Sequence, residues 1–116
     1  MELKIFLQRL QESPDSIAFN DTIDVIDALY EFTPTAFSNG NQLNEAGKNN
    51  GSCKIFSFAK LHRLSPQQTL YCFGDYYRKD VLGNPNGIDH QNIRNFMQSG
   101  WEGISFKGDA LTPKRA

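Results

Sequence analysis

The residues of this chain best suited to chemistry lie in the segment Asp89–Asn95, DHQNIRN. His90 and Arg94 are four residues apart, so on a helix they share one face. Histidine exchanges protons near neutral pH, and arginine can hold a carboxylate or phosphate through two hydrogen bonds. A structural interpretation stays open beside this one. His90 precedes Ile93 by three residues and Met97 by seven, so it can equally be a packed residue at a helix start.

A second polar segment, Glu45–Ser52, contains two glycines, a lysine and two adjacent asparagines. Together with the first amides of a following helix, these residues could bind an anion. The phosphate-loop pattern G-x-x-x-x-G-K-[ST] is not met, because Lys48 precedes Gly51. In the alternative interpretation, the asparagine side chains hydrogen-bond the backbone of their own loop.

Cys53 is a third candidate. It lies at an expected helix N-terminus, which would lower the pKa of its thiol, and His90 could serve as its base if the fold brings them together. Cys53 and Cys72 lack the short spacing of metal ligands, so we interpret them as buried free thiols of a reducing compartment. His62 and His90 are the two histidines, without carboxylates at ligand spacing, so we expect no metal and no cofactor.

Five helices are predicted to position these segments. The first contains an apolar stripe from Leu3 to Leu10 and ends before Pro14. The second is capped by Asn20 or Asp21 and ends near Tyr30.

The third helix has Ser52 as its cap and is apolar over a wide arc, which predicts a central position. The fourth begins at Ser65-Pro66-Gln68, a capping box, and continues to Val81 with Gly74 closely packed. Asp89 is expected to cap the fifth, which Gly100 closes.

Two segments have extended character. Glu31–Phe37 is rich in Phe and Thr, and Trp101–Lys107 alternates, so we expect them to pair antiparallel. Pro34 restricts the first strand to an edge or a bulge. The predicted fold is therefore a single, mainly helical α+β domain over 1–116, with about five helices on a two-stranded antiparallel ribbon and a frayed tail at 110–116.

The composition excludes some function classes. A chain of 116 residues with a formal net charge of −1 lacks the basic field that nucleic-acid binding needs. No stretch reaches the roughly 20 apolar residues of a membrane span, and the N-terminus does not resemble a secretion signal peptide. We therefore expect neither nucleic acid nor membrane as a partner.

Several long runs also carry a family resemblance: FTPTAFSNG, NEAGKNNGSCKIFSFAKL, QTLYCFGDYYRKDVL and DHQNIRNFMQSGWEGISF. Together they resemble the HopJ (HopPmaJ-like) type III effector family over about residues 6–113. The resemblance implies a small bacterial protein and brings no enzymatic activity and no catalytic residue with it. The residues most typical of the family's motifs correspond here to Asn44, Glu45, Gly47, Asn49, Asn50, Gly51, Ser52, Cys53, Asp89, His90, Asn92, Arg94 and Asn95.

The family name suggests type III secretion into a host cell. An export signal of that kind is expected to be Ser-rich and disordered, whereas residues 1–11 have the pattern of an amphipathic helix and contain no serine. We therefore expect this protein to act in the bacterial cytoplasm.

The leading hypothesis is a non-enzymatic, effector-like binding protein. It would present a polar surface, formed by the Asn/Gly loop and the Asp89 helix, to a small ligand or a protein partner. Candidate binding residues are Asn44, Asn49, Asn50, Ser52, Asn92 and Asn95. The alternative is a small enzyme that uses His90 with Arg94, Glu45 or Cys53, and a third interpretation is a structural or regulatory module without a pocket. We expect residues 38–52 to be ordered by asparagine side-chain hydrogen bonds and to lie against the helix that begins at Asp89.

Overall fold

The computed structural model describes residues 1–114. Its elements follow the chain in this order: α1 (Leu3–Glu12), a 3-10 turn (Pro14–Ser16), α2 (Phe19–Leu29), β1 (Tyr30–Phe32), β2 (Phe37–Asn39), β3 (Gln42–Asn44), α3 (Asn50–Leu61), α4 (Pro66–Tyr71), a π-helix (Tyr76–Val81), α5 (Gln91–Ser99), a second 3-10 turn (Gly100–Gly103), β4 (Ile104–Phe106) and β5 (Leu111–Pro113). The α+β class with predominant helix is confirmed, and the five expected α-helices are present.

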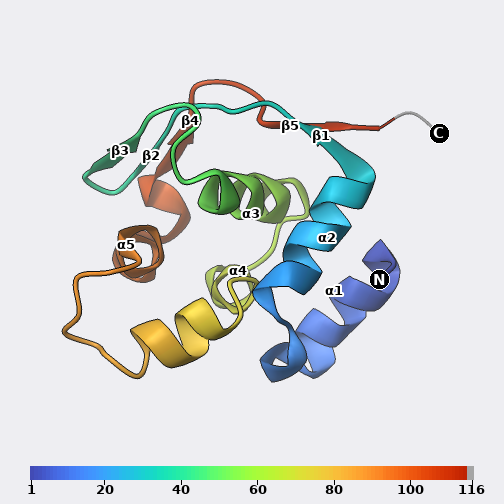
Figure 1. Ribbon diagram of the computed structural model, residues 1–116, viewed down its shortest axis with the longest axis horizontal. Coiled ribbons are helices and arrows are strands. Elements are labelled where there is room, and N and C mark those ends of the chain that lie inside the picture. The colour runs from blue at the N-terminus through green and yellow to red at the C-terminus, as the bar shows by residue number, and fades with distance from the viewer. Residues whose placement is uncertain (115–116) are drawn as a thin grey trace.

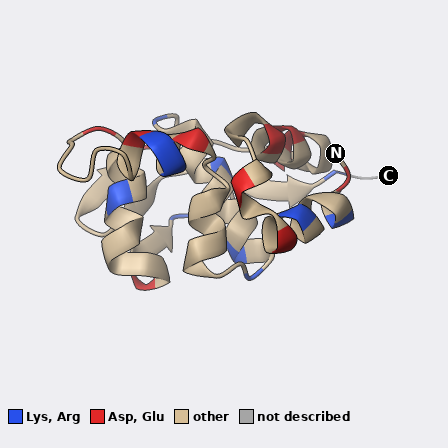
Figure 2. Cartoon of the chain, turned by 90° about the horizontal axis from the view of Figure 1, so that it is seen from below, with Lys and Arg blue, Asp and Glu red and all other residues tan. Residues whose placement is uncertain are grey.

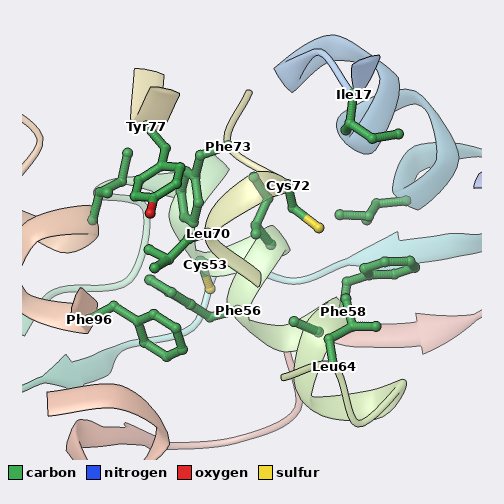
Figure 3. Close-up of a cluster of buried hydrophobic side chains, with 14 of the residues drawn as sticks. Ile17, Cys53, Phe56, Phe58, Leu64, Leu70, Cys72, Phe73, Tyr77 and Phe96 are labelled. Carbon is green, nitrogen blue, oxygen red and sulfur yellow. The ribbon is translucent and has the colours of Figure 1, made fainter. Parts of the chain in front are cut away.

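Helix α3 is the centre of the fold, as its apolar sequence predicts. The other helices and both sheets surround it (Figure 1). Phe56 of α3 is fully buried, and the rings of Phe37, Phe73 and Phe96 lie 6.1, 5.4 and 5.0 Å from it. Figure 3 shows the aromatic side chains of this core gathered around α3 and α4. The core therefore joins β2, the end of α4 and α5 through a single aromatic side chain.

The strand expected over 31–37 is two strands in two sheets. β1 pairs antiparallel with β5, whereas β2 lies between β3 and β4 in a three-stranded antiparallel sheet. Pro34 lies in the irregular stretch between β1 and β2, where its missing N–H does not interrupt a ladder. The expected pairing with the 101–107 segment is present between β2 and β4, with Phe37 opposite Phe106.

Several boundary predictions were wrong, among them the cap of the second helix, because the N-cap of α2 is Ala18 rather than Asn20 or Asp21. Residues 110–114 are not a frayed tail, because Leu111 is buried and β5 pairs with β1; residues 115 and 116 lie outside the described part of the chain. The fourth helix does not run to Val81 as one α-helix, because it is interrupted at Gly74, which has a φ of +63°. A Cβ at Gly74 would lie 2.4 Å from the backbone nitrogen of Phe19, so the close approach expected there is made by the start of α2.

Candidate functional site

Four asparagine side chains join the hairpin β2–β3 to the starts of α3 and α5. The Oδ1 atom of Asn44 accepts hydrogen bonds from Asn92 Nδ2 at 2.9 Å and Asn49 Nδ2 at 2.7 Å. In return, Asn92 Oδ1 accepts bonds from Asn44 Nδ2 at 3.2 Å and Asn39 Nδ2 at 2.9 Å. Asn39, Asn44 and Asn92 are buried, so these bonds replace water that the amides would otherwise need. We call Asn39, Asn44, Asn49 and Asn92 the asparagine network.

The network confirms that residues 38–52 are ordered by asparagine hydrogen bonds and are bonded to α5. Part of this stretch is more regular than expected, because Phe37–Asn44 forms a two-stranded hairpin that turns at Gly40. Gly40 has a φ of +60°, a conformation that glycine adopts without steric cost.

Both helices that meet at the network begin with a left-handed residue. The N-cap of α3 is Asn49, with a φ of 53°, and the N-cap of α5 is His90, with a φ of 49°. The predicted caps Ser52 and Asp89 were therefore wrong by three residues and one residue. The side chains of Asn49 and His90 do not accept a hydrogen bond from a backbone N–H of the helix that each one caps. First-turn N–H groups of both helices therefore remain available as donors.

These two helix starts border one pocket of about 510 Å³. Asn49 and Ser52 line it from the loop and α3, while His90 and Asn92 line it from α5. The complete lining is Phe19, Gln42, Asn49, Gly51, Ser52, Phe73, Tyr76, His90, Gln91, Asn92 and Ile93. The two polar segments singled out in the sequence, about 40 residues apart, therefore come together.

His90 is held by the π-helix rather than by Ile93 and Met97. Its Nε2 atom lies 3.1 Å from an Asp80 carboxylate oxygen, and its ring packs on Tyr76 with centroids 5.2 Å apart. The wider turn of the π-helix carries both partners, and such turns are frequent at functional sites. His90 thus has an orienting carboxylate on one side while it lines the pocket.

Arg94 is four residues from His90 but does not line this pocket. Its guanidinium donates to the Asp89 carboxylate at 2.6 Å and to the backbone oxygens of Asn84 at 2.9 Å and Pro85 at 3.3 Å. The hydrogen bond from Arg94 holds the pKa of the Asp89 carboxyl below its usual value. Arg94 therefore fixes the loop before α5.

Cys53 lies inside the core (Figure 3). Its Sγ donates to the backbone oxygen of Thr35 at 3.5 Å, and it does not line the pocket. The expectation of a lowered thiol pKa was wrong: burial raises the pKa of Cys53, and raises that of Cys72 to about 12. A protonated, enclosed thiol lacks the thiolate character that a nucleophile requires.

The four remaining candidate residues lie outside the pocket lining. Glu45 and Asn50 are exposed and lie outside the pocket lining. Asn95 donates to the Asn39 backbone oxygen and to Gln42 Oε1, both at 3.3 Å, and so supports the hairpin. Asn44 is the hub of the asparagine network rather than a wall residue.

Sequence reasoning missed Asn39, Phe19, Tyr76 and Asp80. Asn39 precedes a glycine, an order typical of a turn, and Tyr76 and Asp80 lie in the segment expected to form the fourth helix, so none of them stood out as a candidate. The four-residue spacing of Tyr76 and Asp80 was the one available signal, because it places them one turn apart.

Within residues 1–114, no three His, Cys, Asp or Glu side chains come together in a way that could hold a metal ion. No helix in the same range has the length and apolar character needed to cross a membrane.

The fold and site define a small, mainly helical α+β protein with a pocket framed by asparagines. Residues 3–111 match the family model described as HopJ type III effector protein, so the chain belongs to this family and is a bacterial effector-like protein. A crystal structure of a protein of unknown function, VPA0580, is similar with 57% sequence identity and a TM-score of 0.96, covering 98% of this chain and 95% of that one. Comparison with curated proteins found no match.

Proposed function

We propose that this protein is a non-enzymatic binding protein that holds a small ligand in the pocket between the Asn/Gly loop and the start of α5. The observation that carries the proposal is the convergence of both polar segments on one pocket of about 510 Å³. That volume lies within the roughly 300–1,000 Å³ range of small-molecule sites. Two free, buried thiols support action in a reducing compartment such as the bacterial cytoplasm.

The arrangement of the network supports binding through preorganisation. Asn44 joins the hairpin, α3 and α5 through buried hydrogen bonds, so the two walls are fixed relative to each other without a ligand. A site whose walls are already ordered loses less conformational entropy when it binds.

A screen of small metabolites by thermal shift and NMR tests the proposal. The screen compares the wild-type protein with Ser52→Leu, which places a larger side chain in the pocket wall, and with Ser105→Leu, an exposed serine on β4 outside the pocket. Compounds that stabilise the wild type should bind Ser105→Leu equally and lose binding to Ser52→Leu. The proposal fails if bound compounds ignore the Ser52 change, or if no compound binds.

The second candidate function is a small enzyme in which His90 acts as acid or base. Its support is the Asp80 carboxylate at 3.1 Å, which can orient the imidazole as carboxylates orient catalytic histidines. Any compound that binds should then be turned over, and His90→Gln should abolish turnover while binding persists. Binding without turnover by the wild-type protein favours the non-enzymatic function.

A further inference from the structure

The pocket is lined by aromatic rings and by side-chain amides. The Tyr76 ring lies between two other rings. Its centroid is 5.0 Å from that of Phe19 and 5.2 Å from that of His90. All three residues line the pocket, and Tyr76 is 43% exposed. Because Phe19 meets Tyr76 edge to face, at 72°, the surface on which a flat ligand ring can stack is the exposed Tyr76 ring itself.

The amide side chains of the lining offer hydrogen-bonding groups to the edge of such a ring. The amide nitrogens of Asn49 and Gln91 are bonded to Asn44 Oδ1 at 2.7 Å and to the Ile88 backbone oxygen at 2.7 Å. Each amide thereby leaves its carbonyl oxygen without a partner among residues 1–114. Both helices also begin at this pocket, so their first-turn backbone N–H groups can supply donors. Paired acceptors and donors are what a nucleobase edge requires.

The charges of the lining point to a neutral ligand. Among the described lining residues there is no Lys, Arg, Asp or Glu. Arg94, the arginine nearest in sequence to the lining residues of α5, already donates to the Asp89 carboxylate and to three backbone oxygens. In the view of Figure 2, basic and acidic residues are interspersed along the chain and do not form a one-signed face. Apart from His90, whose imidazole already pairs with Asp80, a phosphate or carboxylate ligand would find no basic side chain in the lining.

We propose that the pocket binds a neutral planar heterocycle of the nucleobase class, as the free base or a nucleoside. This inference rests on the proposed function and names the ligand class of the same site. The ring stacks on Tyr76, and its edge bonds with the amide oxygens of Asn49 and Gln91 and with the helix-start N–H groups. A hexose has the hydroxyl groups but not the flat face, and a nucleotide adds a phosphate for which the lining provides no lysine or arginine.

The test is titration of the ¹⁵N-labelled protein with adenosine, guanosine, cytidine, uridine, glucose and inorganic phosphate. At least one nucleoside should shift the backbone amide signals of Gly51, Ser52 and Asn92 to saturation, and glucose and phosphate should not. Tyr76→Ala should weaken that binding about tenfold, within the range of one base–aromatic stacking contact. Tyr76→Phe keeps the ring and should change affinity by less than about twofold.

Three results overturn the inference: saturable shifts with glucose or phosphate but no nucleoside, nucleoside binding that Tyr76→Ala leaves unchanged, or no shift with any probe. The proposed function is judged separately by the metabolite screen. A hit of another chemical class that depends on Ser52 would retain the pocket as a binding site and reject only the nucleobase class.

Discussion

Replacing Asn92 by alanine tests whether the asparagine network holds the site together. The side chain of Asn92 takes part in three hydrogen bonds, two with Asn44 and one with Asn39. It is 6% exposed, so the partners left behind cannot easily bond water instead. At about 1 kcal/mol for each net hydrogen bond, Asn92→Ala should lower the free energy of unfolding by about 3 kcal/mol.

Asn95→Ala is the matched control, because the same helix and the same change of residue type cancel the difference in helix propensity. Asn95 has two longer bonds of 3.3 Å and is half-buried, so its loss should cost about 1 kcal/mol. Equilibrium urea unfolding measures both variants. With a slope near 2 kcal/mol per M, Asn92→Ala should move the midpoint down by about 1.5 M and Asn95→Ala by about 0.5 M.

A double-mutant cycle with Asn44→Ala sharpens the test. Two of the three Asn92 bonds are shared with Asn44, so the double variant should lose less stability than the sum of the single variants. Equal midpoints for Asn92→Ala and Asn95→Ala, or additive losses in the cycle, would show that the network is not a cooperative unit. The asparagine network would then not hold the two sides of the pocket in place.

Three further predictions concern the fold around the site. Gly74→Ala should lower the free energy of unfolding by about 2–4 kcal/mol, measured by thermal or urea unfolding, because the new Cβ meets backbone atoms. Gly47→Ala is the control: nothing lies within 4 Å of its Cβ, so it should cost only about 1 kcal/mol for its positive φ. Equal losses in the two variants would show that close packing at Gly74 is not the cause. Cys53 and Cys72 should react with a thiol reagent at pH 8 only after the chain unfolds, since burial raises both pKa values and keeps the thiols protonated, and fast labelling of the native protein would contradict this. Burial lowers the pKa of His62, so the unfolded chain binds a proton more readily than the folded protein does. The free energy of unfolding should therefore fall as the pH drops below about 6.5. The urea midpoint, measured from pH 7 to 5, should depend less on pH in His62→Gln than in the wild type.

Local patterns in the sequence predicted those parts of the fold that local forces determine. The capping box at Ser65 is present, with Gln68 N donating to Ser65 Oγ at 3.1 Å and Ser65 N donating to Gln68 Oε1 at 3.1 Å. The apolar arc of α3 predicted its central position, because a helix that is apolar on most sides must be covered on most sides.

The features that escaped prediction depend on contacts between distant residues. The short segment at Leu111 looks like part of a polar tail, and only its pairing with β1, about 80 residues earlier, makes it a strand. The left-handed N-caps are a second case. Local preference favours Ser52 and Asp89, but Asn49 is bonded to Asn44, and His90 is held by Asp80, so tertiary contacts override the cap preference.

The candidate site contains buried residues that stabilise the fold and exposed residues that we propose as ligand contacts. Asn39, Asn44 and Asn92 are buried and bonded to one another, so changing them should affect stability first and binding through it. Tyr76 and Gln91 are exposed on the pocket wall, where side-chain changes cost little folding free energy. Gln91 and Asn92 are adjacent in the chain and both line the pocket, so the sequence could single out their segment, whereas only the hydrogen-bonding pattern distinguishes the buried residue from the exposed one.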